Sequence, residues 1–200
     1  MKKNKLIIFL DPAHGEDVAG KRSPDGLYRE FAWSRGICAD LDLVLSALGY
    51  EVQFTNHSTK EIGLDNRRKY AENFKTDKHK LLLSIHSNAA GNGSVWTNAT
   101  GVEIFTKQGI DKADVFGELF FHAAKNWFPN IKHRYATNEL YGKDKESNLF
   151  MTNSNKYFGV LIEWLFHDNK EDVRKLQNST YNKALVDCIV DAVEAFNDTL

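Results

Sequence analysis

Two histidines and two glutamates of this sequence are candidates for hydrolytic chemistry: His14, Glu30, His86 and Glu163. Two imidazoles and one carboxylate form a typical ligand set for a catalytic zinc ion, which keeps its fourth position for water. Such a metal lowers the pKa of water and polarises a scissile carbonyl. Glu163 lies in the apolar run VLIEWLF, where burying a carboxylate is costly without a task or a partner. We therefore predict zinc on the other three residues and Glu163 as the general base.

The spacing of these residues leaves a structural interpretation open. They lie far apart in the sequence and form no local motif. A histidine that follows a strand can have the purely structural role of capping a turn. A glutamate at the start of a helix is favoured by the helix dipole. Residue type alone therefore indicates the metal site without establishing it.

Strand-like and helix-like segments alternate along the whole chain. Apolar runs and alternating apolar residues predict strands at residues 6–10, 51–55, 80–85, 101–106 and 158–165. Apolar residues at steps of three and four predict helices at residues 33–48, 64–74, 111–127 and 181–196. The polar stretch 129–156 is expected to be an irregular loop of the kind that often lines a functional site.

These elements would bring the candidate residues to one edge of a sheet. Strands interleaved with helices predict a single α/β domain over residues 1–200, with a mainly parallel twisted sheet flanked by helices on both faces. His14 follows the first strand, His86 follows the run LLLSI, and Glu163 lies near the end of GVLIEW. Because ligands of open α/β sheets gather beyond the carboxyl ends of the strands, we expect the zinc site there.

Composition indicates a globular protein and argues against two other classes. The 200 residues are 42% hydrophobic and 26% charged, with a formal net charge of -1. That balance argues against a nucleic-acid partner, and no apolar run approaches the roughly 20 residues of a membrane span. Cys38 and Cys188 are expected to be buried free thiols. The run at residues 6–10 is too short for a signal peptide, so we expect a protein made in the cytoplasm.

At these residues the sequence resembles the zinc-dependent N-acetylmuramoyl-L-alanine amidases of the type 3 family. The family's motifs occur in order as LDPAHG (10–15), Gly26 with Glu30, GYEV (49–52), Leu64 with Arg67 and Ala71, SIHSNA (84–89), GVE (101–103) and VLIEWLFHDN (160–169). Together they extend over nearly the whole chain. The resemblance is therefore more specific than any one of the motifs.

The resemblance implies one zinc ion on His14, Glu30 and His86, Glu163 as the catalytic carboxylate, and peptidoglycan as the partner. The implied reaction is hydrolysis of the amide bond between N-acetylmuramic acid and L-alanine. A phage endolysin that acts on the cell wall or periplasmic peptidoglycan after release suits these features, and an autolysin fragment or a delivered toxin stays open. The rivals are a zinc peptidase that cleaves another amide of the stem peptide and a wall-binding module without catalysis. The oligomeric state is not indicated.

Five further positions carry expectations. Asn88 is expected either to lie beside the substrate or to satisfy a turn. Arg67 is expected to tie its helix to the sheet by a salt bridge. His167, four residues past Glu163, is expected to be a surface histidine, with an approach to the zinc as the alternative. The pair Trp164-Leu165 replaces smaller residues of the family and is expected to reshape the substrate groove.

Overall fold

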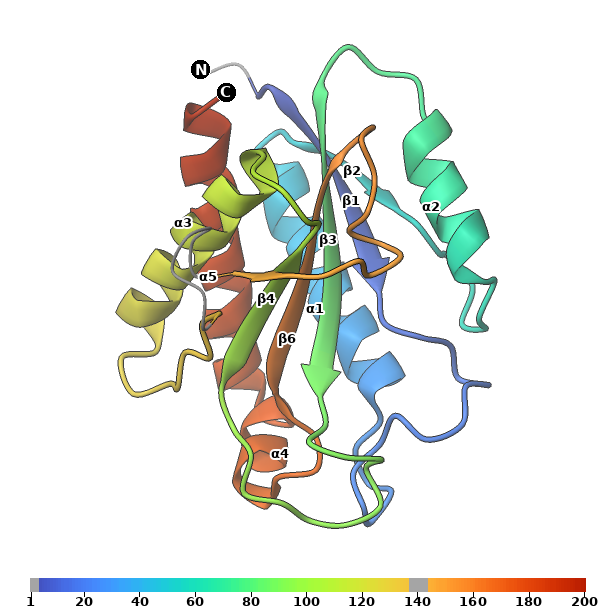
Figure 1. Cartoon of the computed structure of the whole chain (residues 1–200), viewed down its shortest axis with the longest axis vertical. Coiled ribbons are helices and arrows are strands. Elements are labelled where there is room, and N and C mark those ends of the chain that lie inside the picture. The colour runs from blue at the N-terminus through green and yellow to red at the C-terminus, as the bar shows by residue number, and fades with distance from the viewer. Residues whose placement is uncertain (1–3, 137–143) are drawn as a thin grey trace.

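A six-stranded sheet with helices on both faces forms the described part of the chain, residues 4–136 and 144–200, in this computed structural model (Figure 1). The strands are β1 (Leu6–Pro12), β2 (Glu51–Phe54), β3 (His79–Asn88), β4 (Val102–Thr106), β5 (Lys145–Glu146) and β6 (Phe158–Phe166). The helices are α1 (Glu30–Ala47), α2 (Leu64–Asn73), α3 (Lys112–Trp127), α4 (Lys170–Leu176) and α5 (Ser179–Asp198).

The sheet order is β2-β1-β3-β6-β4-β5. The four strands β2, β1, β3 and β6 run parallel to one another. β4 runs antiparallel to β6 and pairs in parallel with β5. The prediction of a mainly parallel α/β sheet is therefore confirmed. β1 and β3 lie in the middle of the sheet, which explains why both appear in the sequence as short, continuous apolar runs.

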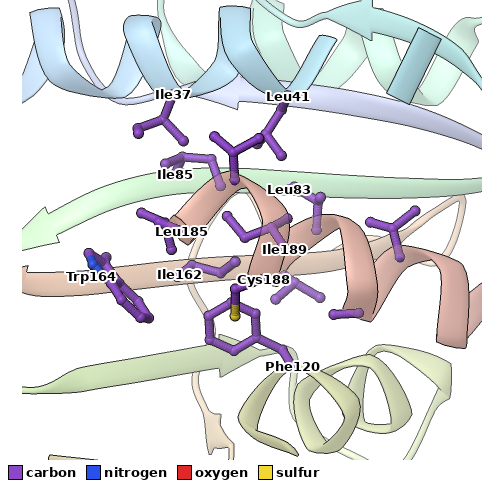
Figure 2. Close-up of a cluster of buried hydrophobic side chains, with 14 of the residues drawn as sticks. Ile37, Leu41, Leu83, Ile85, Phe120, Ile162, Trp164, Leu185, Cys188 and Ile189 are labelled. Atoms are coloured by element: carbon purple, nitrogen blue, oxygen red, sulfur yellow. The ribbon is translucent and has the colours of Figure 1, made fainter. Parts of the chain in front are cut away.

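The two faces of the sheet bury different residues of the same strands. Leu6, Ile8 and Leu10 of β1 belong to the larger core cluster, which α1, α3 and α5 cover. Figure 2 shows this cluster, with residues of β3 and β6 packed between the helices. Ile7 and Phe9 point to the opposite face, where they pack with Ala71 of α2. Helices thus lie on both faces, as predicted.

Local signals in the sequence account for the ends of several helices. Gly49 adopts a φ of +84°, and its backbone N–H donates to the carbonyl of Ser46, which ends α1 and turns the chain into β2. Asp111 and Asp114 form a capping box at the start of α3. Asn178 caps α5 by accepting a hydrogen bond from the N–H of Tyr181.

Two elements were not predicted. The stretch 129–156 contains the short strand β5, and its residues 137–143 lie outside the described part of the chain. α4 follows β6 directly, with Asn169 as its N-cap. Cys38 and Cys188 are buried and unpaired, as predicted. None of the helices in residues 4–136 and 144–200 combines the length and the apolar character that crossing a membrane requires.

Candidate active site

The four candidate residues meet at the carboxyl ends of three neighbouring strands. His14 lies two residues after β1, and Glu30 is the first residue of α1. His86 lies within β3 rather than after it, so the strand extends further than its apolar run indicated. The register of the sheet pairs His86 directly with Glu163 of β6. The structure therefore brings together all four residues that the sequence singled out.

His14, Glu30 and His86 form a group that can hold a metal ion. His14 Nε2 lies 3.4 Å from Glu30 Oε2, and His86 Nδ1 lies 3.0 Å from Glu30 Oε1. One ligand atom from each residue falls within 4.8 Å of the others, and no second such group of His, Cys, Asp or Glu occurs among the described residues. The two imidazole rings are perpendicular, with centroids 5.1 Å apart. Two nitrogens and one carboxylate oxygen are the donor set of many catalytic zinc sites.

The two histidines shift the pKa of Glu30, and Glu30 shifts the pKa of His86. Burial alone would raise the pKa of Glu30, which is 2% exposed, but the hydrogen bonds and charges of His14 and His86 outweigh it and lower that pKa well below its usual range. Burial opposes protonation of His86, yet the hydrogen bond and charge of Glu30 raise the pKa of His86 overall. Metal ligands bind in their deprotonated form. A divalent cation bound to these three residues would therefore displace the protons that Glu30 and the imidazoles share.

A buried network holds the side of His86 that faces away from Glu30. His86 Nε2 lies 3.2 Å from Ser84 Oγ, and Ser84 Oγ donates to Asp11 Oδ2 at 2.6 Å. Asp11 also accepts from Thr55 and from Arg67. Metal-binding histidines commonly have such a partner on the second ring nitrogen, which fixes the orientation of the ring.

Arg67 connects α2 to the loop that carries His14. It is 1% exposed, its Nη1 lies 3.3 Å from Asp11 Oδ1, and its Nη2 lies 2.7 Å from Glu61 Oε2. Nη2 also donates to the carbonyl oxygen of His14 at 2.9 Å. The prediction that Arg67 ties its helix to the sheet is confirmed. The structure adds that the same guanidinium holds the backbone of His14, which has a φ of +53°.

His167 was predicted to be a surface residue, and this was wrong. It is 3% exposed and its Nδ1 lies 2.9 Å from the carbonyl oxygen of Ser87 and 4.0 Å from Glu30 Oε2. Ser87 in turn donates its backbone N–H to Glu30 Oε1 and accepts a hydrogen bond from the Tyr28 hydroxyl. His167 and Ser87 thus lie against Glu30, and Tyr28 supports Ser87, so the structure favours the alternative in which His167 lies close to the metal group.

Glu163 faces the same group but makes no comparable bonds. Its Oε2 is buried without a hydrogen-bond partner in the described part of the chain. Burial and, after it, the negative charges of Glu30 and Glu103 raise the pKa of Glu163 to about 8 against the opposing charge of His86. An unpartnered buried carboxylate oxygen beside a metal-ligand group has the geometry of a proton acceptor.

A β-bulge follows Glu163. His86 pairs with Glu163, but Asn88 pairs with Phe166, so β6 contains one more residue than β3 over this interval. Leu165 adopts a φ of +60°, and both Trp164 and Leu165 are fully buried in the larger core cluster. The expectation that this pair reshapes the substrate groove is therefore wrong, since both side chains pack into the protein.

Asn88 is held by neighbouring protein groups. Its Nδ2 donates to Glu103 Oε2 at 3.1 Å, and its Oδ1 accepts from the backbone N–H of Ala89 at 2.8 Å. The second bond is the turn role considered from the sequence. Asn88 nevertheless lines the same cavity as the catalytic candidates.

A cavity of about 380 Å³ opens over the four residues. Its wall combines polar groups of β3 with the loop at residues 19–21 and with Leu149 and Leu161. Lys21 of this loop was not singled out from the sequence, because an exposed lysine in a polar loop carries no distinguishing pattern.

Comparisons with known proteins agree with this geometry. Residues 8–195 match the model of a family described as N-acetylmuramoyl-L-alanine amidase. A comparison with curated protein sequences finds no significant match.

Solved amidase structures share the fold. The CwlD amidase of Clostridioides difficile, solved in complex with the GerS lipoprotein, has a TM-score of 0.81 and 19% identity, with 98% of this chain and 100% of that chain covered. An N-acetylmuramoyl-L-alanine amidase of Clostridium difficile 630 has a TM-score of 0.80 and 22% identity, with 98% of each chain covered. The catalytic domain of the CD27L endolysin, which targets Clostridia difficile, has a TM-score of 0.67 and 18% identity over 95% of this chain and 97% of that chain.

Proposed function

Since this chain belongs to the N-acetylmuramoyl-L-alanine amidase family, we propose that His14, Glu30 and His86 hold one zinc ion and that Glu163 is the general base. The chain is a hydrolase of the amide bond that joins N-acetylmuramic acid to L-alanine in peptidoglycan. The observation that carries the proposed roles is the placement of Glu163, whose buried Oε2 has no hydrogen-bond partner among the described residues, beside the His–Glu–His group.

The donor set of the site fits zinc. Its two imidazole nitrogens and one carboxylate oxygen leave room for a further ligand, and the network behind His86 supplies the outer contacts that such sites use. A zinc ion bound there would supply a Lewis acid that lowers the pKa of water and polarises the lactyl carbonyl of the muramic acid.

Glu163 would move the proton of the reaction. It accepts a proton from the attacking water at a carboxylate oxygen as the new C–O bond forms at the lactyl carbonyl carbon. It then donates that proton to the nitrogen of L-alanine as the C–N bond breaks, so the peptide leaves with a neutral amine. The raised pKa of Glu163 suits the second half of this cycle, in which the carboxyl acts as an acid.

The test is digestion of purified peptidoglycan by zinc-loaded wild type and by zinc-loaded Glu163→Gln, with products identified by mass spectrometry. The matched control is Glu194→Gln, which removes an exposed carboxylate from α5. We expect the wild type and the control to release peptides that begin with L-alanine, and Glu163→Gln to be slower by at least about 100-fold. Cleavage of a different amide would favour the peptidase alternative, and full activity of Glu163→Gln would remove Glu163 from the mechanism.

We further propose a wall-lytic role of the endolysin kind, because the substrate lies outside the cytoplasmic membrane. The enzyme would then act on the cell wall or periplasmic peptidoglycan after release. Lysis of susceptible cells by expressed protein only once the membrane is permeabilised would support this role. Lysis without permeabilisation would contradict it.

A further inference from the structure

Lys21 provides the one Lys or Arg side chain among the described residues that line the site cavity. The other ionisable lining residues are His14, Glu30, His86, Glu163 and His167, which the metal group, the base and their support already use. The Lys21 side chain is exposed and makes no ion pair or hydrogen bond within residues 4–136 and 144–200. A cation at the rim of an active site, without a protein partner, is available to a negatively charged ligand.

The backbone of Lys21 is fixed to the metal group. Its carbonyl oxygen accepts the N–H of Glu30 at 3.0 Å, so Lys21 is bonded directly to the first residue of α1. The next residues close a small antiparallel turn, in which Arg22 bridges Arg29 and Ser23 N–H donates to the carbonyl of Tyr28 at 3.0 Å.

The conformation of this turn is unusual for a lysine. Gly20 and Lys21 have φ values of +71° and +53°. A non-glycine residue keeps such a conformation where its surroundings determine it, and here the bond to Glu30 does so. The turn therefore fixes the backbone of Lys21 relative to Glu30, and the side chain extends from that point along the cavity wall.

The ammonium group lies within electrostatic range of the reacting centre. Burial is the main cause of the raised pKa of Glu163, and the positive charge of Lys21 is among the groups that oppose it. Burial likewise lowers the pKa of His167, and Lys21 lowers it further. Lys21 lines the same cavity as Glu163 and His167, so its positive charge lies on the wall of that cavity.

The chemistry of the substrate limits what this cation can meet. N-acetylated sugars are neutral, and the lactyl carboxyl of the muramic acid is consumed in the scissile amide. The carboxylates of the substrate therefore all lie on the peptide side. The nearest one to the scissile bond is on the residue after L-alanine, whose Cα is about 3.8 Å from that of the alanine.

We propose that Lys21 is a specificity-determining residue that binds the free α-carboxylate of the stem-peptide residue following L-alanine. This inference rests on the proposed amidase function and adds the substrate form that the site prefers. A stem whose second residue is D-glutamate would bind through an ammonium–carboxylate pair. A stem with D-isoglutamine, which has a carboxamide in the same place, would lose the charge of that pair.

The experiment compares two uncross-linked glycan polymers that differ only in this group, with L-alanyl-D-glutamyl or L-alanyl-D-isoglutaminyl stems. The quantity measured is the ratio of kcat/KM for the two polymers, with zinc-loaded wild type, Lys21→Gln, Lys21→Arg and a control, Lys69→Gln. Lys69 is an exposed lysine on α2 that does not line the cavity. We expect the wild type to favour the D-glutamyl polymer by about fivefold to tenfold, which is the size of effect that a partly exposed charged pair supports.

The outcomes separate this inference from the proposed function. Lys21→Gln should bring the ratio close to one, Lys21→Arg and Lys69→Gln should keep it, and added salt should reduce it in the wild type. A wild-type ratio near one, or an unchanged ratio in Lys21→Gln, overturns the role of Lys21 while cleavage itself upholds the amidase. Failure of the wild type to release L-alanyl peptides from either polymer overturns both.

Discussion

Replacing Glu163 by glutamine should change how the stability of the metal-free protein depends on pH. Glu163 lies beside Glu30 and Glu103, and burial together with these charges raises its pKa from 4.5 to about 8. Between these two pH values the folded protein keeps a proton on Glu163 that the unfolded chain has already released. Because the folded state then binds more protons than the unfolded state, its free energy of unfolding falls as the pH rises through this window.

The expected size follows from the shift. One pH unit inside the window corresponds to about 1.4 kcal/mol for one group, so raising the pH from 5.5 to 7.5 would remove at most about 2.7 kcal/mol. Partial solvent access to the site and the opposing charge of His86 reduce this figure. We therefore expect the wild type to lose about 1 to 2 kcal/mol more than Glu163→Gln over the same interval. Other buried carboxyls, such as Asp114 with a pKa raised to about 6 by burial, contribute equally to both proteins.

The assay is urea denaturation of both proteins in the presence of a chelator, at pH 5.5 and pH 7.5, followed by tryptophan fluorescence. Equal losses in the two proteins would refute the reasoning, since they would show that Glu163 is ionised throughout. A larger loss in the wild type would also agree with the proposed role of a bound cation in this site. A carboxyl with a pKa near 8 can accept a proton at neutral pH only when a positive charge beside it lowers that pKa.

Three further predictions concern the metal group and the backbone around it. Glu30→Gln should weaken zinc binding by more than about tenfold, measured by competition with a chelator, because the amide supplies no charge to the site; unchanged affinity would remove Glu30 from the ligand set. Arg67→Met should lower the free energy of unfolding by about 3–5 kcal/mol in urea titrations, because it leaves the buried Asp11 without its cation; a loss below about 1 kcal/mol would contradict this. Gly101→Ala should lower the free energy of unfolding by about 2 kcal/mol or more in thermal unfolding, because φ is +119° and the new Cβ would lie 2.3 Å from a carbonyl oxygen. The control Gly36→Ala, whose new Cβ meets nothing within 4 Å, should leave the stability unchanged or raise it.

The parts of the fold that were predicted correctly are those with a strong apolar pattern. β1, β3 and β6 are buried strands at the middle of the sheet, so their residues form apolar runs that are visible without alignment. Since His14, His86 and Glu163 lie at the carboxyl ends of these same strands, their meeting follows from the topology. α4 was missed because it has only seven residues, although Asn169 followed by acidic residues is a helix-start signal.

The misplacement of His167 has a specific physical cause. In an unbroken strand, residues 163, 165 and 167 would share one face, and the polar residues after Phe166 would simply leave the sheet. The bulge at Leu165 instead turns that side chain into the core and brings His167 beside Ser87 and Glu30. Bulges and tight turns are usually predicted from glycines in the sequence, because glycine tolerates a positive φ.

In this chain the turns that shape the site largely lack that glycine. His14, Lys21 and Leu165 are the non-glycine residues with positive φ in the described part of the chain, and each lies at or next to the candidate active site. Their conformations are maintained by contacts that no local pattern reveals: the Arg67 guanidinium on the carbonyl of His14, and the N–H of Glu30 on the carbonyl of Lys21. Strain held by distant residues in this way is typical of functional sites. The candidate ligands could therefore be singled out from their residue types and the family motifs, whereas the contacts that hold the backbone of His14 and Lys21 required the folded structure.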